Sequence, residues 1–300
     1  MPTDTPKPEE ATAPDWREIS QNAAMRGILG ALLLLPYRLR VPFAGWVISR
    51  LVAPLVGWRR RIADNLHRTC PDLTPAEIKR LQREVPDNAG RTLMEIYSGQ
   101  DFIDRVKDTA FEGPGVAAFE EARAAGRPVV LVTAHFGNYD APRAALFAQG
   151  YPLGALYRRM RNARFNDHYV RAISQIGEPV FPVDRKGILG LIRHLGQGGI
   201  IGILVDVYAI GGADLTFFGQ PAPTAVSAGE WALKYDALIV PIYGVRQPDG
   251  LSFRIVLDTP IPHGTPDEIG QALNDSLEAQ VRANMAQWFW IHRRWACRIA

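Results

Sequence analysis

Continuous apolar runs alternate along most of the chain with segments whose apolar positions recur every three or four residues, which predicts β-strands separated by α-helices. The first predicted strand, Pro128–Ala134, is apolar throughout, as expected for a strand buried on both faces. Further strands are predicted at Leu153–Arg158, Pro179–Val183, Ile200–Val207, Leu238–Val245 and Ser252–Leu257. Helical patterns occupy Gly115–Ala125, Asp140–Phe147, Ala163–Ile176, Gly187–Leu195, Val226–Tyr235 and Glu268–Trp290.

This order of elements predicts an α/β fold with a largely parallel central sheet flanked by helices. The turn sequence Pro248-Asp249-Gly250 joins the last two strands, so an antiparallel hairpin is expected there. We expect residues 101–300 to form this domain, in one structural unit with a helical region at residues 24–100. A capping box, Thr74 with Glu77 around Pro75, starts one helix of that region. Residues 1–23 are expected to be a disordered tail.

The most apolar segment, Ile28–Trp58, is interrupted by prolines and arginines, so no run reaches the roughly 18 apolar residues of a membrane-spanning helix. It combines aliphatic clusters with Tyr37, Trp46 and Trp58, aromatic residues that suit the headgroup region of a bilayer. The segment therefore predicts association with a membrane surface. Two helices that simply pack onto the domain core are the alternative.

Composition narrows the functional classes. The chain has 300 residues, of which 47% are hydrophobic and 22% charged, enough apolar material for a large core. The net charge of only +3, with arginines among membrane-seeking residues, disfavours nucleic-acid binding. Cys70 and Cys297 have neither disulfide nor zinc-ligand spacing, and the HExxH, Walker A and GxGxxG motifs are absent. We expect no metal and no cofactor.

The sharpest candidate for chemistry follows the first predicted strand, in residues 134–140, AHFGNYD. Ligands bind at the carboxyl ends of strands in such sheets, and His135 stands at that end. Asn138 is suited to cap the next helix, and Asp140 falls in its first turn. We predict that Asp140 accepts the Nδ1 proton of His135, which leaves Nε2 as a general base for a substrate hydroxyl that attacks an acyl carbonyl. Ordinary packing and a favourable helix dipole are the alternative.

Several sequence blocks, taken in order, resemble the lipid A late acyltransferase family, which includes lauroyl/myristoyl and phosphatidylinositol mannoside acyltransferases and shares the HX4D motif of glycerolipid acyltransferases. The resemblance covers the chain from about residue 25 onward. An acidic residue and a proline that the lipid A enzymes carry before the last block are not evident here. The blocks are Arg61-x3-Asn65-Leu66 with Cys70-Pro71-Asp72, His135-x4-Asp140, Tyr157-Arg158-Arg159, Asp206 before Phe217–Thr224, and Trp290–Trp295.

The resemblance implies an O-acyltransferase that moves a fatty acyl group from an acyl carrier protein or coenzyme A thioester to a hydroxyl of a membrane lipid, a lipid A precursor. It implies a location on the cytoplasmic face of the bacterial inner membrane. A lysophospholipid or glycolipid acceptor is the alternative within this class. A non-catalytic peripheral lipid-binding protein and a hydrolase are the rivals from other classes, although Ala225–Gly229 lacks one residue of the GxSxG nucleophile motif.

The same blocks supply candidate substrate-binding residues. Arg158 and Arg159 are expected to hold a phosphate, unless they belong to a solvated basic loop. Phe217, Phe218 and Gly219 are expected to line an acyl-chain tunnel, or else to fill the core. The remaining substrate-binding candidates are Asn138, which can instead cap the helix after His135, Asp206, which can orient the site, Thr224, which can instead cap a helix, and His292 and Arg293, which can bind acceptor or carrier anions or cap the last helix.

Overall fold

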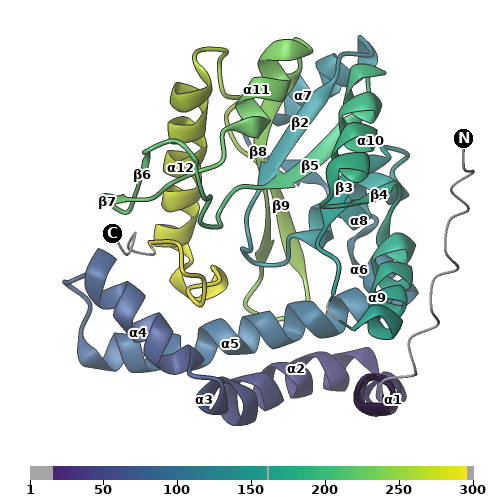
Figure 1. The fold of residues 1–300 in the computed structure, drawn as a ribbon, viewed down its shortest axis with the longest axis vertical. Coiled ribbons are helices and arrows are strands. Elements are labelled where there is room, and N and C mark those ends of the chain that lie inside the picture. The colour runs from purple at the N-terminus through teal and green to yellow at the C-terminus, as the bar shows by residue number, and fades with distance from the viewer. Residues whose placement is uncertain (1–15, 161, 296–300) are drawn as a thin grey trace, which may run out of the picture.

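The computed structural model describes residues 16–160 and 162–295. Its centre is a seven-stranded sheet in the order β1-β9-β8-β2-β5-β3-β4 (Figure 1). All neighbouring strands are parallel except β8 and β9, which form an antiparallel hairpin. The predicted fold class and hairpin are thus confirmed. The strands are β1 (Phe111–Glu112), β2 (Val129–Thr133), β3 (Leu153–Tyr157), β4 (Val180–Pro182), β5 (Ile200–Leu204), β8 (Leu238–Arg246) and β9 (Phe253–Leu257).

Helices cover both faces of the sheet, because each central strand is apolar on both sides. In β2, Val130 and Val132 pack toward α10, α11 and α12, whereas Val129 and Leu131 pack toward α7 and α8. The predicted last helix is too long: α12 ends at Ala283, and a 3-10 turn, η2 (Met285–Gln287), follows. The helices are α7 (Val116–Ala124), α8 (Asp140–Ala148), α9 (Ala163–Ile176), α10 (Arg185–Gly196), α11 (Ser227–Lys234) and α12 (Pro266–Ala283).

The N-terminal helices lie across the end of the sheet where β2 ends, with α5 between α2 and the sheet (Figure 1). Helices α2 and α5 approach closely at Gly45 and Gly90, since a Cβ on Gly90 would lie 2.7 Å from the carbonyl oxygen of Ala44. The elements are α1 (Trp16–Leu33), α2 (Tyr37–Val47), the π-helix η1 (Ile48–Val52), α3 (Ala53–Leu55), α4 (Trp58–Thr69), α5 (Pro75–Tyr97) and α6 (Gln100–Val106).

The ends of these elements test two expectations. The capping box of Thr74 and Glu77 starts α5 with Pro75 in its first turn, as predicted. Helix α1 begins at Trp16, so the predicted tail boundary at residue 23 is too late, because the helix-compatible residues 16–23 are continuous with the apolar segment that follows. Residues 1–15 lie outside the described residues.

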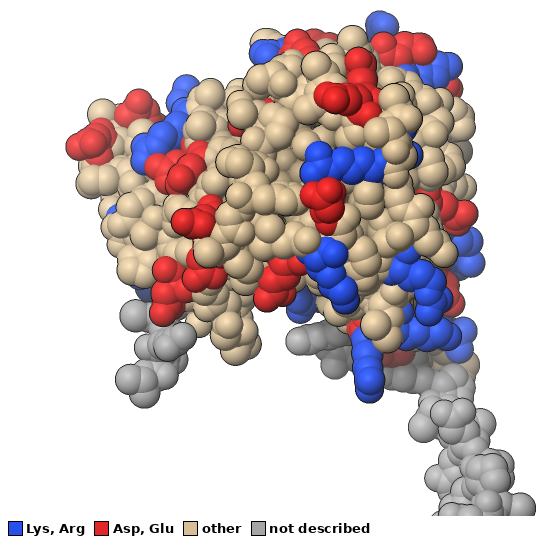
Figure 2. Space-filling model, turned by 90° about the horizontal axis from the view of Figure 1, so that it is seen from above, with Lys and Arg blue, Asp and Glu red and all other residues tan. Residues whose placement is uncertain are grey.

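The outer side of the N-terminal helices is rich in exposed apolar side chains. Leu39, Phe43 and Trp46 form a stripe along α2 and are 59%, 46% and 49% exposed. The opposite end of the molecule, seen from above in Figure 2, instead carries acidic and basic side chains side by side. Among the described helices none is by itself long and apolar enough to cross a bilayer, although Tyr37–Leu55 and Trp58–Thr69 together have suitable length and composition with an 85° bend between them.

Candidate active site

The register of two neighbouring strands brings His135 and Asp206 together. Thr133 is paired with Leu204 in the parallel ladder of β2 and β5. His135 and Asp206 each stand two positions beyond this pair, at the same edge of the sheet. Because parallel strands leave the sheet in the same direction, the two side chains emerge next to each other.

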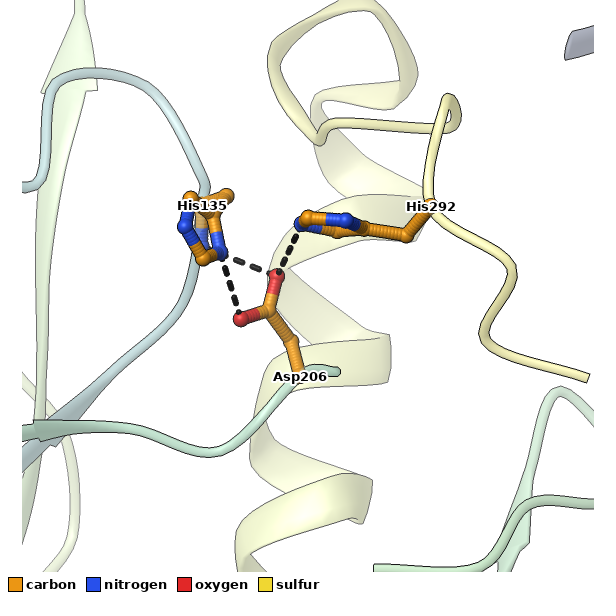
Figure 3. A group of neighbouring side chains, drawn as sticks. All are labelled: His135, Asp206 and His292. Atoms are coloured by element: carbon orange, nitrogen blue, oxygen red, sulfur yellow. Dashed lines mark hydrogen bonds and ion pairs between the residues drawn. The ribbon is translucent and has the colours of Figure 1, made fainter. Parts of the chain in front are cut away.

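Asp206 holds both the backbone and the ring of His135 (Figure 3). The backbone N–H of His135 donates to Asp206 Oδ2 at 2.9 Å, and His135 Nδ1 lies 2.9 Å from Asp206 Oδ1. The indole N–H of Trp288 donates to Oδ2 at 3.0 Å. With a carboxylate as acceptor, Nδ1 carries the proton and Nε2 keeps its lone pair.

Two opposing effects set the charge of Asp206, whose side chain is fully buried. Burial raises its pKa, but the charge of His135 and the hydrogen bonds from this residue, helped by His292, hold the pKa of Asp206 below its ordinary value. The carboxylate is therefore ionised at neutral pH. It can fix the tautomer of His135 and stabilise the imidazolium that forms when His135 takes up a proton.

A second imidazole, that of His292, lies against the first. The centroids of the two rings are 4.5 Å apart, in an edge-to-face arrangement. His292 Nε2 is 3.8 Å from Asp206 Oδ2 (Figure 3). Burial lowers the pKa of His292 to about 4, so this ring is neutral at pH 7. The ligand atoms of His135, Asp206 and His292 lie within 4.8 Å of one another, so these residues are also the set that can hold a metal ion.

Asp140 does not accept the proton of His135, and this prediction is wrong. Its Oδ1 accepts a hydrogen bond of 2.7 Å from Arg143 Nε, and both side chains are buried. The physical reason is the helix: Asp140 opens α8, and its carboxylate meets the side chain three residues later rather than the strand end behind it. Asn138 stabilises the start of α8, because its Oδ1 accepts a hydrogen bond of 2.9 Å from the backbone N–H of Asp140.

An apolar cavity of about 310 Å³ lies beside His135. Its walls come from α5, η1, the turn after β2 and the segment after α12, so residues far apart in sequence enclose it. Its lining residues are Ile48, Trp58, Val85, Asn88, Ala89, Thr92, Leu93, Ile96, His135, Gly137, Tyr139, Met160, Tyr169, Gln287, Trp288 and Phe289. Most of these side chains are hydrocarbon or aromatic, which suits an aliphatic chain that ends at His135.

Phe217 and Phe218 of the block Phe217–Thr224 lie in the core and not in this cavity, whereas Gly219 is exposed. Phe217 and Phe218, from the short hairpin β6 (Thr216–Phe217) and β7 (Gln220–Pro221), are buried against Trp288, Trp290 and Trp295. The expectation that they line an acyl tunnel is not met; the core alternative describes them. Gly219 takes a φ of +65°, which the tight hairpin turn requires.

Thr224 and Arg294 form a structural contact in the same region. Thr224 does not cap a helix, since α11 has Val226 at that position. Its Oγ1 accepts a hydrogen bond of 2.6 Å from Arg294 Nη2, and Arg294 Nη1 donates to the carbonyl of Pro223 at 2.7 Å. Arg294 is fully buried and ties the C-terminal segment to this loop.

The predicted anion-binding arginines are exposed. Arg158 follows β3 with its side chain in solvent, and Arg159 forms an exposed ion pair of 3.2 Å with Asp184. Arg293 is exposed as well, next to the half-buried His292. None of the three lines the cavity beside His135.

The sequence reasoning missed the residues that hold the C-terminal segment in place. Asn65 in α4 donates from Nδ2 to the carbonyl oxygens of Trp290 and His292, at 2.7 and 2.9 Å. Arg68 donates to the carbonyl of Trp295 at 2.7 Å. Two blocks noted in the sequence, near residues 61–72 and 290–295, are thus docked on each other, and their order along the chain gave no sign of it.

Comparisons with known proteins match the chain to bacterial acyltransferases. The family model described as bacterial lipid A biosynthesis acyltransferase matches residues 18–296. The lipid A biosynthesis palmitoleoyltransferase of Escherichia coli (strain K12) is 24% identical over 279 residues, which cover 91% of this chain and 90% of that protein. A lipid A biosynthesis acyltransferase of Haemophilus influenzae is 22% identical over 274 residues, covering 88% and 85% of the two chains.

A relative of different name shares a shorter region. The phosphatidylinositol mannoside acyltransferase of Mycolicibacterium smegmatis is 23% identical over 175 residues, covering 57% of this chain and 58% of that protein. The family match spans nearly the whole described structure, including His135, Asp206 and His292. The chain therefore belongs to the bacterial lipid A biosynthesis acyltransferase family and is an enzyme that transfers acyl groups.

Proposed function

We propose that this acyltransferase moves a fatty acyl group from an acyl thioester to a hydroxyl group of a membrane lipid, a lipid A precursor. One observation carries the proposal: His135, hydrogen-bonded through Nδ1 to the buried Asp206, lines an apolar cavity of about 310 Å³. A general base at the wall of a hydrocarbon-compatible cavity fits a reaction between a fatty thioester and an alcohol. Family membership and the names of the relatives support the same chemistry.

The proposed reaction has two steps. Nε2 of His135 removes the proton of the acceptor hydroxyl while its oxygen attacks the thioester carbonyl, and Asp206 stabilises the resulting imidazolium. The tetrahedral intermediate then collapses: the carbon–sulfur bond breaks, the thiolate leaves, and the imidazolium returns the proton to it. The products are an ester and a free thiol. His135 acts on the substrate's own hydroxyl, so no enzyme nucleophile is required.

The acyl chain of the donor occupies the cavity in this proposal, between α5 and the residues after α12. Each buried methylene group contributes about 0.8 kcal/mol to binding. The donor is carried by acyl carrier protein or by coenzyme A. Both are anionic, and the exposed cations Arg158, Arg159 and Arg293 are placed to meet phosphates or acidic side chains of donor or acceptor.

We infer the location of the protein in the cell from the exposed apolar side chains on the outer face of the N-terminal helices. The stripe of Leu39, Phe43 and Trp46 on α2 would insert into the acyl boundary of the cytoplasmic leaflet of a bacterial inner membrane. The cavity extends to the π-helix that continues α2, because Ile48 is one of its lining residues. We propose that a lipid acceptor reaches His135 from this side, without leaving the bilayer.

A glycolipid acceptor is the second candidate. The shared region with the phosphatidylinositol mannoside acyltransferase of Mycolicibacterium smegmatis favours it, since that protein's name specifies a mannoside. The proposed base and cavity serve either acceptor, and the difference lies in the head group.

Purified protein incubated with acyl-carrier-protein or coenzyme A thioesters and a lipid A precursor tests the proposal, with the products identified by mass spectrometry. We expect one added acyl ester with wild-type protein and none above background with His135→Ala. Mass spectrometry of the lipids from a deletion strain then names the acceptor, since one species lacks an acyl group. Normal turnover by His135→Ala, or unchanged lipids in the strain, contradicts the proposal.

A further inference from the structure

A stripe of polar side chains on α5 is hydrogen-bonded to the turn that follows His135. Asn88, Thr92 and Glu95 are spaced by four and three residues and therefore lie on one face of the helix. Asn88 Nδ2 and Thr92 Oγ1 both donate to the carbonyl oxygen of Gly137, at 3.0 and 2.9 Å. Glu95 Oε2 accepts a hydrogen bond of 2.8 Å from Asn138 Nδ2. One helix face thus holds two consecutive residues of the catalytic turn.

Arg246, on β8, is hydrogen-bonded to all three side chains of this stripe. Its Nη1 and Nη2 donate to the two carboxylate oxygens of Glu95, at 2.5 and 2.7 Å, and its Nε donates to Asn88 Oδ1 at 2.7 Å. Nη2 also donates to Thr92 Oγ1 at 3.1 Å. Glu95 is 0% and Arg246 8% exposed, so the charges are paired inside the protein.

The turn after His135 packs tightly between α5 and β8. Gly137 has a φ of +55°, and a Cβ at this position would lie 1.9 Å from the carbonyl oxygen of Gly244. The same carbonyl accepts the backbone N–H of Asn138 at 3.0 Å. Gly244 and Arg246 are two residues apart on β8 and share a face of the strand. The turn therefore packs against β8 on one side and is hydrogen-bonded to the polar stripe of α5 on the other.

A buried ion pair is weak support for stability, because desolvation offsets much of its attraction. The hydrogen-bond partners indicate its role: apart from the carbonyl of Gly250, which accepts from Arg246 Nη1 at 3.1 Å, the groups bonded to the Glu95 and Arg246 side chains are themselves bonded to, or part of, the turn after His135. We propose that Glu95 and Arg246 are positioning residues of the acyl transfer, which act through Asn138 and Gly137 to aim His135 at the cavity. This inference rests on the proposed function. A displacement of about 1 Å can cost on the order of 100-fold in rate.

The test compares Glu95→Gln, Thr92→Val and Asn138→Ala with a control, Arg40→Gln. Arg40 is another buried arginine, and its side chain donates to Ser98, Asp101 and the carbonyls of Leu33 and Leu35, none of which belongs to the turn. At saturating substrates and well below the unfolding temperature, we expect Glu95→Gln to lower kcat at least 10-fold with little change in KM. Thr92→Val removes one bond to Gly137 and should lower kcat about 3-fold. Arg40→Gln should lower Tm but leave kcat within 2-fold.

A double variant separates positioning from general loosening. If Glu95 acts through Asn138, then adding Asn138→Ala to Glu95→Gln lowers kcat little further, whereas independent effects multiply. Multiplying effects, or kcat within 2-fold of wild type for both Glu95→Gln and Thr92→Val, overturn the inference. Should Glu95→Gln fail to fold, Thr92→Val decides.

Amide hydrogen exchange of a peptide spanning residues 134–140 provides a readout without activity. We expect faster exchange in Glu95→Gln and Thr92→Val than in Arg40→Gln, and equal rates overturn the inference. If wild-type protein shows no acyl transfer in the parallel assay, the proposed function fails. The exchange measurement alone then decides whether Glu95 and Thr92 fix the position of the turn.

Discussion

His135 Nδ1 lies 2.9 Å from Oδ1 of Asp206, a residue that follows the neighbouring strand rather than the same helix turn. The proposed base and its carboxylate partner are thus brought together by the pairing of β2 with β5. The same carboxylate accepts the backbone N–H of His135, so both the position and the ring orientation depend on it.

Asp206→Asn should lower kcat by about 10²- to 10⁴-fold, because the amide neither fixes the correct tautomer nor stabilises the imidazolium. Binding of the thioester should change little, since Asp206 is buried away from the cavity. Steady-state kinetics with a purified donor check this. An Asp206→Asn variant with wild-type kcat would remove Asp206 from the mechanism.

Asp140→Ala should act mainly on stability. It leaves Arg143 buried without its carboxylate, and breaking such a pair costs about 3–5 kcal/mol. Asp140→Asn, which keeps a hydrogen-bond acceptor, should be milder. Urea unfolding measures both, and kcat measured on the folded fraction should fall less than in Asp206→Asn. An equal or larger loss of kcat at wild-type stability would restore a direct catalytic part for Asp140.

His292 predicts a pH dependence of stability. Its pKa in the folded protein, about 4, is below its ordinary value of 6.5, so the unfolded chain takes up a proton first as the pH falls. The contribution of neutral His292 is complete above pH 6.5 and is lost as the pH falls toward 4. At 1.36 kcal/mol per pKa unit the loss amounts to at most about 3 kcal/mol.

Unfolding free energies of wild type and His292→Gln between pH 7 and pH 4 measure this contribution together with the coupling of His292 to His135 and Asp206, because groups far from the site titrate equally in both proteins. We expect the wild type to lose more stability over this window than the variant. Parallel pH curves would show that His292 is protonated in the folded protein at its ordinary pKa.

Ala89→Phe should shorten the acyl chain that the enzyme accepts. Ala89 lines the cavity from α5, and a phenyl ring there displaces about four methylene groups, each worth about 0.8 kcal/mol, so kcat/KM for long chains should fall on the order of 100-fold. Short-chain donors should be used normally. Ala117→Phe, on the exposed side of α7, is the matched control. Equal losses for short and long donors would place the chain elsewhere.

Phe43→Asp and Trp46→Asp should release the protein from vesicles, because each puts a charge into the apolar stripe of α2. Leu189→Asp, at a similarly exposed apolar position of α10, controls for charge alone. Flotation with vesicles of phosphatidylethanolamine and phosphatidylglycerol measures binding. Retention of both stripe variants would show that another face contacts the bilayer.

The local pattern of the chain predicted six of the seven strands of the central sheet and the hairpin, because strand and helix periodicities are properties of neighbouring residues. It missed β1, which is only two residues long and too short to show a period. It could not predict that β5 lies next to β2, and this pairing brings Asp206 rather than Asp140 to the imidazole. Aromatic residues look alike in a core and in a cavity wall, so the sequence could not decide between the two for Phe217 and Phe218, which lie in the core. The spacing of Asn88, Thr92 and Glu95 was visible, but its meaning depends on what α5 faces.

The docking of the C-terminal segment on α4 has a consequence for biosynthesis. Trp288 and His292 contact Asp206, and Asn65 donates to the carbonyls of Trp290 and His292, so these contacts form only after residues 288–292 have been synthesised. At about 5–20 residues per second, roughly ten seconds or more separate the emergence of the two imidazoles from the ribosome. In the proposed arrangement, the first helices of a nascent polypeptide can therefore reach the bilayer before the segment that completes the surroundings of Asp206 has been synthesised.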